Sequence, residues 1–260
     1  MKQEFTTVWL DTVKDIINSG KVVSPRGQHT RELPQRTITV NMNYPVLTIP
    51  SRKLSYKFMA AEAYWILSGD NRVKTIAPFN ERISQFSDDG QTFFGAYGPK
   101  VVDQLTFVVD KLREDNDSRQ AGLTIWRENP PATKDVPCTI AIFFNIRNAK
   151  LNCHVFMRSS DAWLGLPYDV FNFSMLTHLV CGLLNNVGDI NVRPGGLYLT
   201  AASSHLYFRD INAAVDCIHA PTKPSLITPD NLYRHPDVLM STLDKLRFSS
   251  PGDPLRWWEG

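Results

Sequence analysis

A cysteine and an arginine are the first residues whose types and spacing could do chemistry in this chain of 260 residues. Cys138 follows a proline and begins an almost wholly apolar run, and Arg158 stands directly after a second apolar run. An arginine in a neighbouring strand would favour the thiolate form of the cysteine, which is the nucleophilic form. The alternative is a small buried hydrophobic residue, as most free cysteines are.

Two further polar residues stand among apolar neighbours. Glu62 lies within the helical apolar pattern of residues 56–67, where an unpaired carboxylate would be costly. It is either a structural hydrogen-bond partner or an acid–base group with an adjusted pKa. Tyr97 lies in an aromatic turn beside glycines, and its side chain is either part of the core or a hydroxyl in a proton relay.

Cationic and imidazole side chains add a possible anion or sugar site. Arg26 precedes Gly27 in a turn-rich loop, where it is either a solvated charge or a ligand of an anion that the glycine lets approach the backbone. His205 and Tyr207 stand two residues apart near the end of a predicted strand and form a second polar cluster. A histidine satisfied in the core or at the surface is the alternative for His205.

The spacing of apolar residues predicts the elements that must position these side chains. Helices are expected at residues 5–17, 56–67, 101–112, 170–187 and 210–219, and strands at 37–41, 121–126, 138–146, 151–157 and 195–202. Loops and short helices are expected at 72–91 and 128–137, and a proline-rich tail at 221–260. Because helices and strands alternate without a regular βαβ order, repeat or linker, we expect one α/β (α+β) domain over residues 1–260 with a large mixed sheet.

Composition excludes several classes of protein. The net charge is +2 and no run of lysine and arginine is present, so we expect no nucleic-acid partner. No apolar run reaches the roughly 18–20 residues of a membrane span, and no secretory signal is evident. The four cysteines, Cys138, Cys153, Cys181 and Cys217, show no metal-ligand spacing and fit a reducing compartment. These features predict a cytoplasmic protein without a metal.

The order of the motifs resembles the thymidylate synthase family of nucleotide C5-transferases over nearly the whole chain. The motifs that carry the resemblance are Ser-Pro-Arg-Gly at 24–27, Glu-Ala-Tyr-Trp-Ile-Leu-Ser-Gly-Asp at 62–70, Ala-Tyr-Gly at 96–98, Asp-Ser-Arg at 117–119, Pro-Cys at 137–138, Arg-Ser-Ser-Asp-Ala-Trp-Leu-Gly-Leu-Pro at 158–167 and Ser-His-Leu-Tyr at 204–207. The resemblance implies a thymidylate synthase-like fold, in which helices flank a large mixed β-sheet and the sheet mediates a homodimer.

The resemblance also implies the reaction. Cys138 matches the family's nucleophile, which adds to C6 of a pyrimidine nucleoside monophosphate and makes C5 nucleophilic. C5 then takes a one-carbon unit from 5,10-methylenetetrahydrofolate, the cosubstrate. Glu62 matches the carboxylate that organises water and proton transfers, and Tyr97 matches a hydroxyl near the C5 proton.

Binding residues carry over from the resemblance in the same way. Phosphate contacts are implied for Arg26, Arg158 and Ser159, sugar contacts for His205 and Tyr207, and folate contacts for Asp161, Glu62 and Tyr168. Arg119 matches a residue that reaches the phosphate of the neighbouring subunit. Gln120 stands where the family usually has a second arginine, so part of that contact is in doubt.

One departure from the family concerns the choice of base. Synthases have an asparagine where this chain has Asp169, and that amide donates to uracil O4 and accepts from N3–H. An ionised carboxylate only accepts, so it opposes O4 but suits the N4 amino group of cytosine and a protonated N3. An unpaired polar group costs about 1–3 kcal/mol, so Asp169 predicts a preference for cytosine. The alternative is that Asp169 only caps the following helix.

A second departure concerns the fate of the one-carbon unit. Residues 71–96 lack the tryptophans against which synthases pack the intermediate, and Ile83, Ser84 and Phe86 occupy that region. We expect a less screened, more polar pocket in which water adds and gives a 5-hydroxymethyl product. Thr139 replaces the family's histidine, as it does in cytidylate hydroxymethylases, and the ending Leu-Arg-Trp-Trp-Glu-Gly also differs from synthases.

These features predict a cytidylate 5-hydroxymethylase that acts on dCMP or CMP. A dCMP 5-methylase and a uridylate enzyme, either a thymidylate synthase or a dUMP hydroxymethylase, are the enzymatic alternatives. A nucleotide- or RNA-binding relative without activity is the alternative from another class, and the retained Cys138, Arg158 and Glu62 argue against it.

Overall fold

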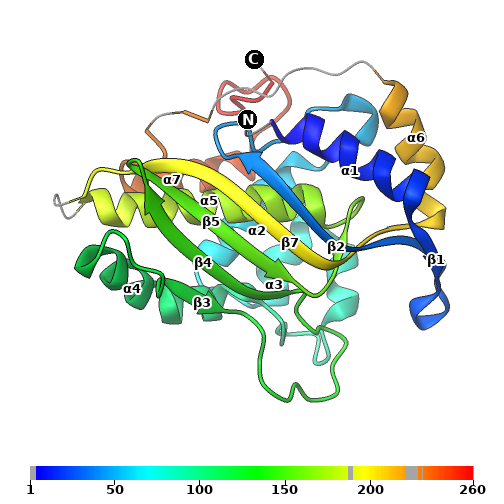
Figure 1. Cartoon of the computed structure of the whole chain (residues 1–260), viewed down its shortest axis with the longest axis horizontal. Coiled ribbons are helices and arrows are strands. Elements are labelled where there is room, and N and C mark those ends of the chain that lie inside the picture. The colour runs from blue at the N-terminus through cyan, green and yellow to red at the C-terminus, as the bar shows by residue number, and fades with distance from the viewer. Residues whose placement is uncertain (1–3, 187–189, 221–227, 230, 260) are drawn as a thin grey trace.

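A mixed β-sheet forms the centre of the computed structural model, which describes residues 4–186, 190–220, 228–229 and 231–259 (Figure 1). The strands of these residues are β1 (Lys21–Val23), β2 (Thr30–Asn41), β3 (Gly122–Thr124), β4 (Thr139–Arg147), β5 (Lys150–Met157), β6 (Ser160–Asp161) and β7 (Arg193–Tyr207). They lie in the order β1-β2-β7-β5-β4-β3, and β6 pairs with β7. The sheet is mixed because β7 runs parallel to β5 and β6 and antiparallel to β2.

Helices cover one face of this sheet, as the view in Figure 1 shows. The α-helices of the described residues are α1 (Phe5–Ser19), α2 (Tyr56–Leu67), α3 (Val73–Ile76), α4 (Tyr97–Glu114), α5 (Leu166–Asn186), α6 (Ile211–His219) and α7 (Pro236–Leu246). Short 3-10 helices are η1 (Pro25–Gly27), η2 (Pro50–Arg52), η3 (Ala77–Phe79), η4 (Glu81–Phe86) and η5 (Phe208–Asp210). Helix α5 is buried along most of its length between α2 and the sheet, which explains its nearly continuous apolar sequence.

The β4–β5 hairpin places the candidate nucleophile next to the candidate arginine. Asn148 and Ala149 both have positive φ angles, 53° and 55°, which gives the left-handed two-residue turn that matches the twist of a hairpin. The register of the hairpin pairs Thr139 with Met157. The residues just beyond that pair therefore meet, and the backbone N–H of Arg158 donates to the carbonyl of Cys138 at 2.8 Å.

The long β2–β7 pair gathers a second group of residues. Glu32 lies opposite His205, and Thr30 lies opposite Tyr207. Strand β6 adds Asp161 on the other side of His205. Residues far apart in the sequence are thus brought to one end of the sheet.

The observed elements confirm most of the predicted ones. Helix α2 begins and ends where expected, because Ser55 caps it by accepting a hydrogen bond from Phe58 N–H at 3.3 Å. The predicted end of α5 at Val187 lies outside the described residues.

Several predictions of elements were incomplete, and helix α4 for example begins at Tyr97 rather than at residue 101. Strand β2 begins at Thr30 rather than residue 37, because Gln35 with φ 52° forms an irregular step that lets a polar, proline-containing segment continue to pair. Strand β7 extends to Tyr207. Helix α7 was expected to be part of a proline-rich tail, although Leu239, Leu243 and Leu246 already had helical spacing and are buried.

The opposite face of the sheet carries exposed apolar side chains on its central strands. Phe143 of β4 and Phe156 of β5 are 40% and 44% exposed and pack edge-to-face, with ring centroids 6.4 Å apart. Strand β3 lies at one edge of the sheet. There the side-chain amide of Gln104 donates to the carbonyl of Thr124 and accepts from its backbone N–H. Within the described part of the chain, no helix combines the length and apolar character that crossing a membrane requires.

Candidate active site

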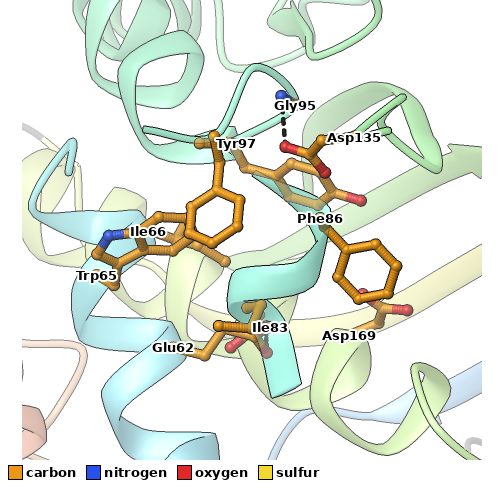
Figure 2. A pocket seen from close by; sticks show the side chains of 12 residues that line it. Glu62, Trp65, Ile66, Ile83, Phe86, Gly95, Tyr97, Asp135 and Asp169 are labelled. Atoms are coloured by element: carbon orange, nitrogen blue, oxygen red, sulfur yellow. Dashed lines mark hydrogen bonds between the residues drawn. The ribbon is translucent and has the colours of Figure 1, made fainter. Parts of the chain in front are cut away.

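Helices α2 and α5, η4 and the loops that precede α4 and β4 surround a cavity of about 160 Å³ (Figure 2). Its wall is formed by Glu62, Trp65, Ile66, Ile83, Phe86, Phe93, Gly95, Ala96, Tyr97, Asp135, Asp169 and Asn172. Phe86 is also 46% exposed, so the cavity reaches the surface there. Three of the residues predicted to act in catalysis, Glu62, Tyr97 and Asp169, therefore share one cavity.

Cys138 lies close enough to this cavity for acidic residues of its wall to affect the pKa of its thiol. Burial raises the pKa of the Cys138 thiol; the charge of Arg158 lowers it, and the charges of Asp169 and Asp135 raise it again. The sequence predicted that Arg158 would favour the thiolate. Its influence has the predicted direction, but burial and the acidic neighbours outweigh it.

Arg158 also fixes the backbone that carries the nucleophile. Its Nε donates to the carbonyl of Pro137 at 3.0 Å, and its Nη2 donates to the carbonyl of Val136 at 2.8 Å. Together with the backbone bond to Cys138, these contacts hold three successive residues. An arginine can do this because its planar fork carries several donors, and donors remain for an anion.

Glu62 has the environment of an acid–base group. Its Oε2 accepts a hydrogen bond of 2.8 Å from Asn172 Nδ2, which joins α2 to α5. Burial raises the pKa of Glu62 to about 7, and the Asn172 bond opposes that rise. A group with this pKa gains and loses a proton near neutral pH, as proton transfer in catalysis requires.

Asp169 differs from the sequence-based expectation in its charge. Burial raises its pKa well above the usual aspartate value, and the charges of Glu62 and Asp161 add to the rise. The prediction of cytosine assumed an ionised carboxylate, whereas these surroundings favour the neutral acid, which has one donor and an acceptor. Gly165 leaves room for this carboxyl, since a Cβ there would lie 3.3 Å from Asp169 Oδ2.

Thr139 fixes the hydroxyl of Tyr97. The Tyr97 oxygen accepts hydrogen bonds from Thr139 N at 3.2 Å and from Thr139 Oγ1 at 2.9 Å. The hydroxyl proton of Tyr97 is therefore free to point to another acceptor, including one in the cavity. Burial raises the pKa of Tyr97 well above 10, so the group is a neutral phenol. The threonine after the nucleophile thus has a defined structural role.

A second cluster lies around His205. Ser159 Oγ and His205 Nδ1 are 3.4 Å apart, and the rings of His205 and Tyr207 are in edge-to-face contact with centroids 5.4 Å apart. Burial lowers the pKa of His205, and the charges of Asp161 and Glu32 oppose this. The charge of the exposed Arg26 also lowers this pKa, so η1 lies near this cluster. Hydroxyl, imidazole and guanidinium groups together suit a sugar and a phosphate.

Other predicted residues lie outside the cavity wall. Arg119 and Gln120 line a separate polar depression that shares no residue with the cavity. The Tyr168 hydroxyl accepts a hydrogen bond from Ser55 N at 3.3 Å and so faces the start of α2. Asp161 Oδ1 accepts bonds from Trp163 N and Leu164 N at 2.8 and 3.0 Å, which shapes the turn before α5.

The apolar part of the wall contains one residue that was not expected there. Ile83 and Phe86 line the cavity, as predicted, whereas Ser84 does not, and Trp65 of α2 adds a further apolar side chain (Figure 2). Flat apolar side chains at the cavity suit a planar ring such as that of a folate. Asp135 adds to the polar part of the wall, and sequence reasoning missed it. Its position three residues before the candidate nucleophile was the only signal.

The C-terminal tryptophans pack elsewhere. Trp258 is buried against Tyr56, with ring centroids 5.4 Å apart, and Trp257 stacks near Phe171. Arg256 fixes the segment through its Nε and Nη2 bonds to Ser249 Oγ and O, at 2.9 and 2.8 Å. The aromatic ending predicted to differ from synthases is thus part of the packing around α2 and α5.

Comparison with known proteins agrees with this fold. The family model described as "Thymidylate synthase" matches residues 7–230, so the chain belongs to the thymidylate synthase family of enzymes. The chain is also similar to the deoxyuridylate hydroxymethyltransferase of Bacillus phage SP01, with 29% identity over 235 residues. The match covers 81% of this chain and 59% of that relative, so the chain spans somewhat over half of the relative's length.

Proposed function

We propose that residues 1–260 act as one catalytic domain that converts a pyrimidine nucleoside monophosphate to its 5-hydroxymethyl derivative. The observation that carries this proposal is the meeting of Glu62, Tyr97 and Asp169 in one cavity beside Cys138. Family membership supports one-carbon transfer, and the name of the phage relative supports hydroxymethyl transfer.

The residues of the chain have distinct parts in this reaction. Cys138 adds to C6 of the pyrimidine, which makes C5 nucleophilic. 5,10-Methylenetetrahydrofolate, the proposed cosubstrate, supplies the methylene carbon when it is bound. Tyr97 stands near C5 to receive or relay its proton, and Glu62, with a pKa of about 7, exchanges protons with water in the cavity. Asp161 and Tyr168 are proposed folate contacts.

Asp169 supports cytosine as the base. In the adduct, a cytosine ring carries a proton on N3 and an amino group on C4, and both donate. A neutral Asp169 can give its proton to N3 and then accept from both groups as a carboxylate. Uracil is the second candidate, because the phage relative is named for deoxyuridylate and a neutral acid also fits O4 and N3–H.

The cluster around His205 supports recognition of the sugar and the phosphate. Arg26, Arg158 and Ser159 are proposed phosphate ligands, and His205 and Tyr207 are proposed sugar ligands. Because Arg158 holds the backbone of the nucleophile, phosphate binding and the position of Cys138 depend on the same side chain.

We also propose that two copies pair through the bare face of the sheet. Phe143 and Phe156 are exposed there, and apolar side chains on a sheet face are stabilised by being covered. In such a homodimer, Arg119 would complete the phosphate site of the neighbouring subunit. This explains why it lies apart from the cavity of its own subunit.

Release of tritium from C5-labelled dCMP, CMP and dUMP, each with methylenetetrahydrofolate, tests the proposal. We expect release from a cytosine nucleotide and a product heavier by CH2O. Cys138→Ala should bind nucleotide but release no tritium, because the adduct cannot form. Release from dUMP alone would move the assignment to uracil, and dihydrofolate formation would indicate a methylase. Binding without release from any nucleotide would favour a non-catalytic relative.

A further inference from the structure

A third carboxylate, Asp135, lies on the wall of the cavity and has no part in the reaction as described so far. It belongs to the loop between β3 and β4, three residues before Cys138, and its side chain is half-buried. Figure 2 shows it on the same side of the cavity as Gly95 and Tyr97. Its charge also reaches Cys138, whose pKa it raises.

The carboxyl group of Asp135 is held in place at one oxygen. Oδ2 accepts a hydrogen bond from Gly95 N–H at 2.7 Å (Figure 2). Any side chain at Gly95 would prevent this approach, since a Cβ there would lie 2.3 Å from the Asp135 carbonyl oxygen. The backbone N–H of Asp135 in turn donates to Thr133 Oγ1 at 3.0 Å. No donor among the described residues is assigned to Oδ1, so this oxygen is available to water in the cavity.

Several other polar groups of the cavity already have partners or roles, although Asn172 Oδ1 is a buried acceptor without a partner among the described residues. Glu62 Oε2 is bonded to Asn172, and the Tyr97 oxygen is bonded to Thr139. Asp169 faces the polar edge of the base in the proposed function. Ile83 and Phe86 offer a water no hydrogen bond. The cavity of about 160 Å³ has room for several waters, and one of them can bind to Asp135.

We propose that Asp135 binds the water that adds to the methylene carbon and accepts its proton, an inference that rests on the proposed function. The water oxygen forms a bond to the exocyclic methylene carbon, and the electron pair of the exocyclic double bond moves to C5. The C5–C6 double bond then forms, and the bond from C6 to sulfur breaks and returns Cys138 as a thiolate. The proton of the water passes to Asp135, and no oxidant or reductant is needed.

Burial supports this role, because it raises the pKa of Asp135 and makes the carboxylate a better proton acceptor once it is ionised. The Gly95 bond and the charge of Arg127 oppose the rise, and the charge of Asp88 adds to it. Replacement of Asp135 should therefore affect the addition of water and leave nucleotide binding intact.

The role of Asp135 can be tested by exchange of the hydroxyl oxygen with water, an experiment that needs no folate. By reversal of the same steps, the enzyme should expel the hydroxyl of a 5-hydroxymethyl nucleotide and add it back from 18O-labelled water. The label is read by mass with 5-hydroxymethyl-dCMP, 5-hydroxymethyl-CMP and 5-hydroxymethyl-dUMP. For Asp135→Asn we expect a loss of exchange of about 100-fold or more, because the water loses its base, with unchanged affinity for the nucleotide.

Asp88→Asn is the matched control. Asp88 holds the same loop from outside the cavity, by accepting bonds from Thr133 Oγ1 and from Lys134 N at 3.0 Å. We expect Asp88→Asn to retain most of the wild-type exchange, with only a small loss because the charge of Asp88 no longer raises the pKa of Asp135. Wild-type exchange in Asp135→Asn would overturn the inference, and so would an equal loss in both variants, since loop geometry would then be the cause.

Two further results must be distinguished: a variant that no longer binds nucleotide, and a wild-type protein that shows no exchange. If Asp135→Asn fails to bind nucleotide, Asp135→Glu replaces it. Its longer carboxylate should slow exchange about tenfold with binding retained, and an unchanged rate would overturn the inference. If the wild-type protein binds all three 5-hydroxymethyl nucleotides and exchanges none, the proposed function fails rather than the role of Asp135.

Discussion

Asp169 illustrates how one proton decides what a side chain can recognise. As a neutral acid it presents a donor and an acceptor, which fit cytosine in one orientation and uracil in the other. As a carboxylate it only accepts, so it opposes O4 of uracil. It still suits a cytosine adduct, in which N3 is protonated. Base choice therefore depends on the ionisation of Asp169 and not on the residue type alone.

Asp169→Asn should shift preference toward the uracil nucleotide. The ratio of kcat/KM for dCMP to that for dUMP measures this preference. In the wild-type protein, kcat/KM should fall for both nucleotides as Asp169 ionises, because a carboxylate opposes O4 of uracil and has no proton to give to N3 of cytosine. The amide does not ionise, so this pH dependence should disappear in the variant. A mismatched polar contact of about 1–3 kcal/mol corresponds to a shift of about 5- to 150-fold in the ratio. An unchanged ratio would place base selection elsewhere.

At the scale of elements, the Glu62–Asn172 bond connects α2 and α5 through a carboxyl whose pKa is raised to about 7. The folded protein binds this proton more tightly than the unfolded chain does. The contribution of Glu62 to stability is therefore fully present at low pH, falls as pH rises from about 4.5 to about 7, and is lost above that range.

Glu62→Gln should remove this dependence. Between pH 5 and 8, the free energy of unfolding of the wild-type protein should fall relative to the variant by at most about 3 kcal/mol. Urea unfolding at several pH values measures the difference. Glu81→Gln, which changes an exposed glutamate in η4, should follow the wild-type protein. A difference that is constant with pH would show that Glu62 keeps its usual pKa in the folded state.

The sequence predicted correctly those elements whose conformation depends mainly on their own residues. Helix α2 has a serine cap and a continuous apolar pattern, so its limits were predicted correctly. The first half of β2 is polar and contains Pro34, and it becomes a strand only because β7 lies beside it. The place of Asp135 in the cavity likewise depends on Gly95, which is 40 residues away in the sequence. No local pattern contains such a contact.

The same reasoning explains which properties of the site could be found only from the three-dimensional structure. The motifs predicted that Glu62, Tyr97 and Asp169 act together, and the cavity brings them together. The ionisation of Cys138 and Asp169 could not be predicted in this way. Their pKa values are raised by burial and by several acidic neighbours at once. The roles of the individual residues stay predictions, as does the single domain of residues 1–260.

At the scale of the whole molecule, the separation of Arg119 from the cavity predicts that neighbouring subunits complete each other's sites. Arg119→Ala and Cys138→Ala should each be inactive alone. After subunit exchange, a mixed dimer has one site with both residues intact, so about a quarter of wild-type activity should return with random pairing. Mixing Cys138→Ala with a chain that carries both changes should restore none. Exchanged subunits without recovered activity would contradict a shared site.

The bond between Gln104 and Thr124 has a consequence for how the molecule associates. An unpaired edge strand is a template for a strand from another chain, and sheets can then grow without limit. The side-chain amide of Gln104 imitates a peptide group and occupies the free donor and acceptor of Thr124 on β3. Lateral polymerisation is thereby obstructed at this edge of the sheet, which agrees with the proposed pairing of two copies through its broad face.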